Sequence, residues 1–213
     1  MSTPLLSPEV SGYLDRLVPV RAPELLAMEN AAAQANFPII GPAAGQFCYL
    51  LARLTRARRV FELGSGFGYS TAWFARAVQE NGGGVVHHSV WDEGLSRQAR
   101  RHLEVLGLAD LVEFHVGESV DALARIPDTV DLVFNDIDKD AYPASLDAIE
   151  RRLRSGGVLI VDNALWNGRI FDVSDTSAST TGVRELTRRL ASSPHWITGL
   201  VPIRDGLLVA HRA

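Results

Sequence analysis

The stretch FELGSGFGYS, from Phe61 to Ser70, joins a short apolar run to a helical one. Its three glycines, Gly64, Gly66 and Gly68, let the backbone turn sharply and approach a ligand closely, and the helix that follows offers unpaired N–H groups to an anion. A turn that binds a nicotinamide dinucleotide has glycines spaced GxGxxG, but the third glycine position of that pattern is Tyr69 in this chain. The stretch therefore predicts a strand, a turn and a helix with a different ligand.

Glu62 and Ser70 flank these glycines, with the acid two residues before the first of them. The carboxylate of Glu62 can hold a cationic amine, directly or through water, while Ser70 and the helix N–H groups can receive a carboxylate. This arrangement suits the amino-acid end of a zwitterionic ligand. A tight turn without any ligand is the alternative.

Short apolar runs and helical stretches alternate around this turn. The apolar runs are Arg59–Leu63, Val85–Val90, Leu111–Val116, Val130–Asn135 and Val158–Val161. The helical stretches between them are Ser70–Glu80, Glu93–Leu106, Ser119–Ile126 and Tyr142–Arg154. Alternation of this kind predicts an α/β fold, a parallel sheet with helices on both faces.

Both ends of the chain depart from the alternation. Before the first run, apolar spacing and prolines predict three helices, at Pro8–Val18, Pro23–Asn36 and Pro42–Leu54. After the last run, Trp196–Val201 and Leu207–His211 flank the turn Arg204-Asp205-Gly206, which is typical of a hairpin. We therefore expect a mostly parallel sheet with an antiparallel pair at one edge. No linker or repeat divides the chain, so residues 1–213 are predicted to form one domain with the helical segment 1–55 packed on it.

Oxygen-bearing side chains follow two of the predicted strands. Asp136 comes directly after Val130–Asn135, and Asp162 and Asn163 come directly after Val158–Val161. In open α/β sheets ligands bind beyond the carboxyl ends of the strands. If the two strands are neighbours, two carboxylates and one amide oxygen converge, which suits a hard cation such as Mg²⁺. For a single Asp at a strand end, a helix cap or turn is the alternative.

The composition is that of a globular protein, with 213 residues of which 46% are hydrophobic and 22% charged. The net charge of −4 offers no attraction for nucleic acid or an anionic membrane. No apolar run approaches the ~20 residues that span a bilayer, and the N-terminal sequence shows no secretory signal. The single cysteine, Cys48, cannot form an intramolecular disulfide. We therefore expect a cytoplasmic protein that binds neither nucleic acid nor membrane.

Four segments of the chain together resemble a known family: FELGSGFGYST, DLVFNDIDKDAYP, SGGVLIVDNALWNG and VPIRDGLLVAHR. They are similar to the cation-dependent O-methyltransferases, which include catechol and caffeoyl-coenzyme A O-methyltransferases and small bacterial relatives. The resemblance extends from about Ile39 to the end of the chain. It implies a Rossmann-like, seven-stranded methyltransferase sheet, S-adenosylmethionine as methyl donor, a divalent cation, a small-molecule acceptor and, as in bacterial members, a homodimer.

The resemblance also implies roles for individual residues. Asp136, Asp162 and Asn163 fall on the family's metal ligands, and Lys139 falls on its catalytic base. The positions that fall on donor contacts are Ile40, Glu62, Gly64, Ser65, Gly66, Ser70, Ser119, Asp136 and Asp138. Trp166 follows the metal-binding pair where family members line the acceptor pocket; ordinary packing of this side chain is the alternative.

Two positions depart from the family pattern. The acid that usually holds the ribose hydroxyls is replaced by Val90, so Asp92 or Glu93 is expected to substitute, with Trp91 packing on the adenine. Asn135 stands where an aliphatic residue is usual and either tunes the site or pairs with a backbone group.

Two adjacent histidines, His87 and His88, lie in one predicted strand. Because successive side chains of a strand point to opposite faces, we expect that neither binds a metal and that one faces solvent.

Lys139 is the exception among 21 basic residues, of which all others are arginine. A buried lysine can release its proton, whereas the guanidinium of arginine stays protonated. Lys139 therefore fits a base that takes the proton of a metal-bound acceptor hydroxyl. The acceptor that suits such a metal best is a vicinal diol on an aromatic ring, because two of its oxygens can bind the metal. A surface lysine, or one kept for its charge near the donor, is the alternative.

Three other functions share this type of sheet. A nicotinamide-dependent oxidoreductase lacks support from the glycine spacing and from Val90. A nucleic-acid amino-methyltransferase would carry an Asn/Asp-Pro-Pro-aromatic loop where this chain has NDID. A non-catalytic donor-binding protein of the same fold is the main alternative.

Overall fold

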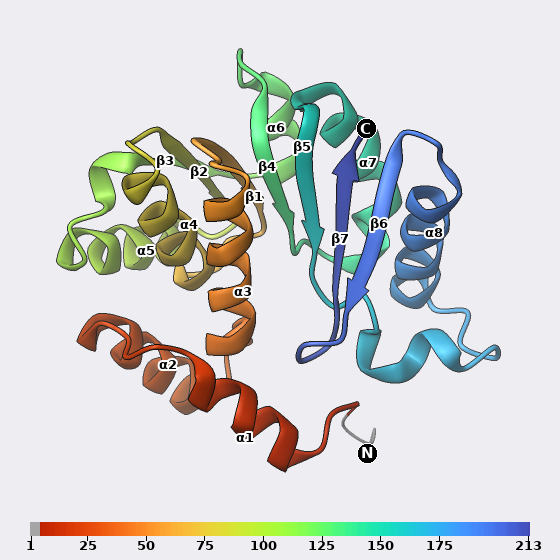
Figure 1. Cartoon of the computed structure of the whole chain (residues 1–213), viewed down its shortest axis with the longest axis horizontal. Coiled ribbons are helices and arrows are strands. Elements are labelled where there is room, and N and C mark those ends of the chain that lie inside the picture. Colours follow the sequence, from red (N-terminus) through yellow and green to blue (C-terminus); the bar gives the residue numbers. More distant parts are fainter. Residues whose placement is uncertain (1–4) are drawn as a thin grey trace.

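A computed structural model, which describes residues 5–213, contains one seven-stranded sheet in the order β3-β2-β1-β4-β5-β7-β6 (Figure 1). The strands are β1 (Arg59–Leu63), β2 (Val85–Val90), β3 (Val112–Val116), β4 (Val130–Asn135), β5 (Leu153–Val161), β6 (Trp196–Val201) and β7 (Leu207–Arg212). The first five strands pair in parallel, whereas β7 runs antiparallel to both β5 and β6. The predicted fold class is therefore confirmed.

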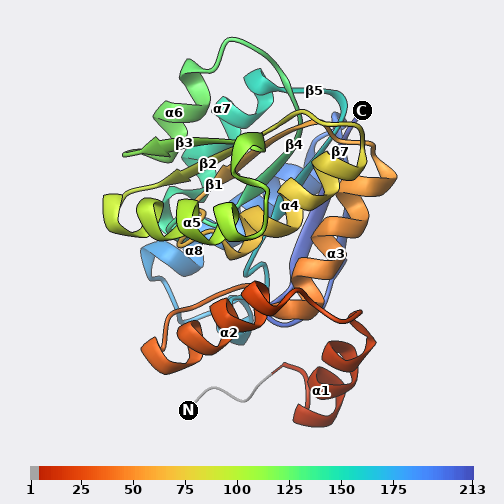
Figure 2. The ribbon, with the colours of Figure 1, turned by 90° about the vertical axis from the view of Figure 1, so that its left-hand side faces the viewer.

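Helices cover both faces of the sheet (Figures 1 and 2). One face carries α3 (Gly41–Leu54), α4 (Tyr69–Glu80) and α5 (Glu93–Val105); the other carries α6 (Ser119–Arg125), α7 (Tyr142–Arg152) and α8 (Ala178–Ser192). Alternate strand residues supply the two cores, so that Val60 packs in the first and Phe61 in the second. A strand buried on both faces reads as a nearly continuous apolar run, as LVF in β4 and VLIV in β5 do.

The remaining elements lie near the carboxyl ends of the parallel strands or connect them. Helices α1 (Pro8–Leu17) and α2 (Pro23–Ala35) lie beyond the carboxyl ends of β4 and β5 (Figure 1). Three short 3₁₀ helices are η1 (Ala109–Leu111), η2 (Lys139–Ala141) and η3 (Trp166–Phe171). Within residues 5–213, no helix has both the length and the apolar character to cross a membrane.

Two elements differ from the sequence-based prediction. Strand β5 begins at Leu153, so the helix predicted to reach Arg154 ends at Arg152. Helix α8 was not predicted, although Ser177 caps its first turn by accepting from the Thr180 N–H. The apolar side chains that it buries are spaced three and four residues apart, at Val183, Leu186 and Leu190. This spacing was a usable helix signal that the many polar residues around it obscured.

The expectation that His87 or His88 faces solvent is wrong, because helices cover both faces of β2. His88 is fully buried beneath α4, with its Nδ1 3.1 Å from the Thr71 hydroxyl, and burial lowers its pKa to about 3. His87 points to the opposite face and is only 7% exposed.

Candidate active site

A cavity of about 780 Å³ opens at the carboxyl edge of the parallel strands. It is bounded by the turn after β1, the loops after β2, β4 and β5, and the turn between β6 and β7. The structure brings together in its lining every predicted site residue except Glu62: Ile40, Gly64, Ser65, Gly66, Ser70, Trp91, Ser119, Asp136, Asp138, Lys139, Asp162, Asn163 and Trp166.

The glycines of the β1–α4 turn are required by its backbone. Gly64 has φ +85°, and a Cβ there would lie 2.6 Å from the carbonyl oxygen of Asp136. Gly68, at φ +92°, is the N-cap residue directly before α4, and a Cβ there would lie 2.8 Å from the Cβ of Ala99. Side chains at these positions would therefore push the turn away from β4 and α5.

Glu62 lies fully buried at the end of β1, and neither of its carboxylate oxygens has a hydrogen-bond partner. Burial raises its pKa to about 7, although the hydroxyls of Ser70, Thr71 and Ser65 act in the opposite direction. A buried carboxylate without a partner is costly to the folded protein. It therefore marks a position where a cationic or protonated group of a ligand, or a water, completes the structure.

Ser65 makes a contact that the sequence did not suggest. Its hydroxyl accepts a hydrogen bond of 3.0 Å from the backbone N–H of Ser89, while its own N–H donates to the Ser89 carbonyl. Ser65 thus joins the glycine turn to β2. It also lines the cavity, so its predicted contact with a donor stays a prediction.

The acidic loops are held at the sheet edge by the backbone. The N–H of Asp136 donates to the carbonyl of Leu63 at 2.8 Å, and the N–H of Asp162 donates to that of Asn135 at 3.0 Å. Tyr142, buried on α7, donates its hydroxyl to the carbonyls of Asp162 and Asn135. These bonds fix the two carboxylates beside each other because β4 and β5 are neighbours.

Two cations neutralise these carboxylates. Lys139 is 8% exposed, and its Nζ lies 2.7 Å from Asp136 Oδ1 and 3.1 Å from the carbonyl oxygen of Ile137. Arg204 pairs with Oδ2 of Asp162. Oδ1 of Asp162 is buried without a partner, and burial, together with the charge of Asp136, raises the pKa of Asp162.

Arg204 and Asp205 line the cavity, although the sequence around them predicts only a hairpin turn. Asp205 accepts from the side-chain amide N–H of Asn163 at 3.0 Å and from the backbone N–H of Asn167 at 2.6 Å. Antiparallel pairing of Val161 with Leu208 places the start of β7 beside the end of β5. The predicted hairpin therefore contained the missing signal, because an antiparallel strand begins where its parallel neighbours end.

The residues at this edge fit a divalent cation. Asp136 and Asp162 provide carboxylate oxygens, one of which, Asp162 Oδ1, is buried and unpartnered. Asn163 donates its amide N–H₂ to Asp205, so its carbonyl oxygen is left as an acceptor. Oxygen donors with this charge match a hard cation.

The loop after β2 lines the opposite end of the cavity. Val90 is 7% exposed and offers no polar atom, while Trp91 is 67% exposed at the rim. Of the two predicted substitutes for the missing acid, Asp92 lines the cavity and caps α5 through the Leu95 N–H. Glu93 instead pairs with Arg97 at the surface. Asp92 is thus the better placed of the two.

The contacts of two further residues, Trp166 and Asn135, bear on the alternatives left open by the sequence. Trp166 is half-buried on the cavity wall, and its ring centroid lies 6.0 Å from Lys139 Nζ. Asn135 donates its side-chain N–H to the Ser145 hydroxyl at 2.9 Å, rather than to a backbone group. Leu5 and Leu6, which the sequence did not mark, line the cavity from the N-terminal segment.

Known proteins resemble this chain in sequence and in structure. The family model described as O-methyltransferase matches residues 21–213. A catechol O-methyltransferase of Niastella koreensis is 30% identical over 190 residues, which cover 86% of this chain and 85% of that protein. A catechol O-methyltransferase of Mycobacterium tuberculosis is 35% identical over 182 residues, covering 84% and 82%.

Solved structures agree with the sequence relatives. The O-methyltransferase TomG from Streptomyces achromogenes, involved in tomaymycin synthesis and solved in complex with SAM, superposes with a TM-score of 0.87 at 29% identity over 96% of both chains. The O-methyltransferase from Bacillus cereus in complex with SAH gives 0.87 at 27% identity, covering 96% of this chain and 97% of that one. From the matching family, the shared fold and the cavity at the carboxyl edge, the chain belongs to the O-methyltransferase family and is an enzyme that uses S-adenosylmethionine.

Proposed function

We propose that the protein transfers the methyl group of S-adenosylmethionine to a hydroxyl of a small catechol-like or phenolic acceptor, held by a divalent cation, with Mg²⁺ the best fit. The observation that carries the proposal is the convergence of Asp136, Asp162 and Asn163 with Lys139 in the cavity that also contains the glycine turn. The catechol O-methyltransferases among the relatives support this acceptor class.

The three oxygen-bearing residues would hold the cation, and each has an atom suited to it. Asp162 contributes its unpartnered Oδ1, and Asn163 contributes the amide oxygen that Asp205 leaves as an acceptor. When bound, a divalent cation lowers the pKa of a coordinated hydroxyl and fixes its direction. Tyr142 holds both strand ends, so the ligands are positioned before anything binds.

Lys139 is the proposed base. It lies between Asp136 and the ring of Trp166, with its Nζ 2.7 Å from the Asp136 carboxylate and 6.0 Å from the Trp166 centroid. In the reaction the S–CH₃ bond breaks as the O–CH₃ bond forms and S-adenosylhomocysteine leaves, while Lys139, which must first have released its own proton to be a neutral amine, accepts the hydroxyl proton. Trp166 would pack against the acceptor ring.

The donor would lie along the glycine turn, close to the positions predicted from the sequence. Glu62 would take up the donor's amine, while Ser70 and the N-terminal N–H groups of α4 would receive its carboxylate. Trp91 and Ser119 line the end of the cavity proposed for the adenine. Contacts of Ile40 and Asp138 with the donor, like the homodimer that the family resemblance implies, stay predictions.

The test is the release of S-adenosylhomocysteine over a panel of catechols and monophenols, with Mg²⁺ and with a chelator. Turnover of at least one catechol that stops on chelation and returns with Mg²⁺ supports the proposal. Turnover that is indifferent to chelator would contradict the cation, and turnover confined to amine acceptors would contradict the hydroxyl.

A further inference from the structure

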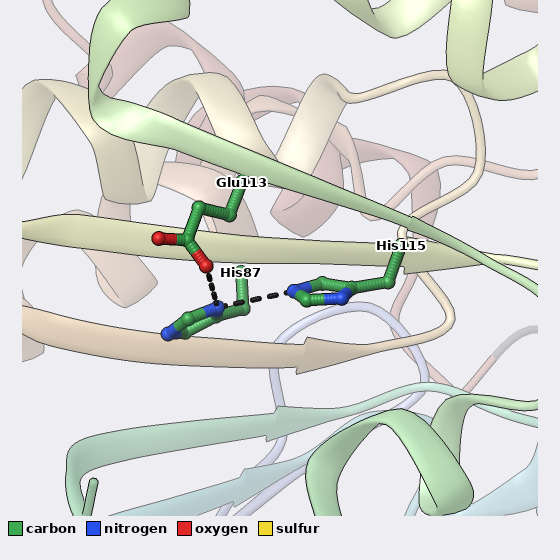
Figure 3. A group of neighbouring side chains, drawn as sticks. All are labelled: His87, Glu113 and His115. Atoms are coloured by element: carbon green, nitrogen blue, oxygen red, sulfur yellow. Dashed lines mark hydrogen bonds and ion pairs between the residues drawn. The ribbon is translucent and has the colours of Figure 1, made fainter. Parts of the chain in front are cut away.

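A second polar cluster lies on the face of the sheet, within strands β2 and β3 rather than after them. His87 on β2 and Glu113 and His115 on β3 point toward one another (Figure 3). Their potential ligand atoms all lie within 4.8 Å of one another. Among residues 5–213, no other group of three His, Cys, Asp or Glu side chains converges in this way.

Strand register creates this cluster. His87 is paired with Glu113, and Ser89 with His115, in the parallel ladder between β2 and β3. Glu113 and His115 are two residues apart, so both point to the same face as His87. On the neighbouring strand Phe61 packs against both imidazoles, with centroid separations of 5.5 Å to His87 and 5.9 Å to His115. The rings are therefore held in place by packing.

The two distances from His87 match those between ligands of one metal ion. Nδ1 of His87 lies 3.1 Å from Nε2 of His115 and 3.2 Å from Oε2 of Glu113. Two atoms bound to Zn²⁺ at about 2.0–2.1 Å in a tetrahedral arrangement are separated by about 3.3 Å.

The three atoms also have too few protons to satisfy one another. Nδ1 of His87 lies within hydrogen-bond distance of Nε2 of His115, whose donor or acceptor role depends on its tautomer, and close to a carboxylate oxygen of Glu113. This nitrogen carries at most one proton, so it can donate fully to only one of the two neighbouring atoms. One of its two contacts is consequently shared or unsatisfied, and a cation between the three atoms would satisfy all of them.

A cation can reach the cluster from one side. A cleft of about 650 Å³ between β3 and α6 is lined by Glu113 and His115, and the Glu113 side chain is 63% exposed. Three carboxylates, Glu113, Glu118 and Asp121, and one guanidinium, Arg125, line this cleft. The excess of negative charge favours a cation, and the open side leaves room for a water ligand.

We propose that His87, Glu113 and His115 form a second metal site, which binds Zn²⁺ and fastens the edge strand β3 to β2. Two imidazoles and one carboxylate favour a borderline ion such as Zn²⁺ over Mg²⁺, which prefers oxygen ligands. The site shares no residue with Asp136, Asp162 and Asn163.

The test is a titration of the chelator-treated protein with Zn²⁺ in competition with a colorimetric chelator, and with Co²⁺ followed by visible absorption. The wild-type protein should bind one tight equivalent of Zn²⁺, show the intense absorption of tetrahedral Co²⁺, and unfold at a higher temperature with Zn²⁺. Glu113→Gln and His115→Gln should each weaken Zn²⁺ binding at least tenfold.

Two variants separate this site from other sources of binding. Asp162→Ala removes a carboxylate from the edge site, and His211→Gln removes an exposed histidine on β7; both should retain the tight equivalent. Because Glu113 is exposed, Glu113→Gln keeps the fold intact even if His115→Gln does not, which circular dichroism checks. The proposal is overturned if the wild-type protein binds no tight Zn²⁺, if folded Glu113→Gln binds it unchanged, or if Asp162→Ala abolishes it.

Discussion

The edge cluster and the face cluster differ in where their residues lie relative to the strands of the sheet. The edge cluster, Asp136, Lys139, Asp162 and Asn163, comes from loops that follow strands. The face cluster, His87, Glu113 and His115, comes from positions within strands. Loop residues after parallel strands meet at one edge whatever the register, whereas a strand residue meets only the neighbour that the register assigns. The first kind of site can therefore be predicted from a sequence and the second cannot.

The two clusters also differ in how their charged and polar side chains are paired. At the edge, Lys139 and Arg204 pair with the carboxylates, yet Asp162 Oδ1 is buried without a partner. On the face, the imidazole of His87 contacts both the imidazole of His115 and the exposed carboxylate of Glu113. The edge cluster thus keeps an unmet buried group within a large cavity, which is typical of a site for substrates and an ion.

The largest effect should come from Asp162→Ala, because it removes a proposed cation ligand at the edge. We expect turnover to fall at least about 1,000-fold, since metal-ion stabilisation is worth several kcal/mol and each tenfold in rate is about 1.4 kcal/mol. S-adenosylhomocysteine release measures the loss, with His211→Gln as the surface control. Full turnover with an unchanged response to chelator would show that the edge cluster does not bind a cation needed for the reaction.

Lys139→Arg should come next, because it keeps the positive charge beside Asp136 and removes the base. Turnover should drop by about 100-fold or more, the usual contribution of a general base, and should recover in part at higher pH. Donor affinity, measured by calorimetry, should stay at the wild-type value. Near-native turnover at neutral pH would show that Lys139 serves only by its charge.

Glu62→Gln tests whether the unmet carboxylate beneath the glycine turn costs stability. Because burial raises its pKa from about 4.5 to about 7, the folded protein binds the proton more tightly than the unfolded chain does. The stability that Glu62 contributes is therefore present below pH 4.5 and lost as the pH rises through 7.

The difference of about 2.5 pH units corresponds to about 3 kcal/mol. We measure the unfolding free energy with urea, without donor or metal. The advantage of Glu62→Gln over the wild-type protein should grow by most of this amount between pH 5 and pH 8. A gain that does not change with pH would mean that Glu62 already has a partner in the free protein.

Val90→Asp should tighten donor binding, since it places a carboxylate where the family resemblance predicts the acid that holds the ribose. Charge-assisted hydrogen bonds of about 1.5–3 kcal/mol correspond to a tenfold or larger gain in affinity. Calorimetry with S-adenosylhomocysteine measures it. Unchanged or weaker binding by a folded variant would indicate that another group, with Asp92 the best placed, already holds the ribose.

The smallest effect should be that of Glu113→Gln on the metal-free protein. Its carboxylate is 63% exposed, and exposed ion pairs contribute about 1 kcal/mol or less. Urea unfolding in the presence of chelator should therefore show a change within that limit. A loss of several kcal/mol would show that Glu113 stabilises the fold without any metal, and the two clusters would then differ less than we propose.

The order of segments along the chain determined the sheet, the glycine turn and the edge cluster. The alternation of strands and helices places the loops after β1, β4 and β5 at one edge, so Gly64, Asp136 and Asp162 were expected at that edge. These predictions needed only which strands are parallel, not how they are aligned. That β4 lies between β1 and β5 comes from the structure. Lys139 was identified in another way, from the family resemblance and as the single lysine among 21 basic residues.

Only the tertiary structure decided which residues from distant strands meet. Arg204 and Asp205 reach the edge because β7 runs antiparallel to β5, and His115 reaches His87 because β3 is aligned with β2 at one particular register. The burial of His88 likewise depends on α4 covering its face. Strand register and the packing of helices on the sheet depend on the summed contacts of whole elements, so they cannot be predicted from any short stretch of sequence.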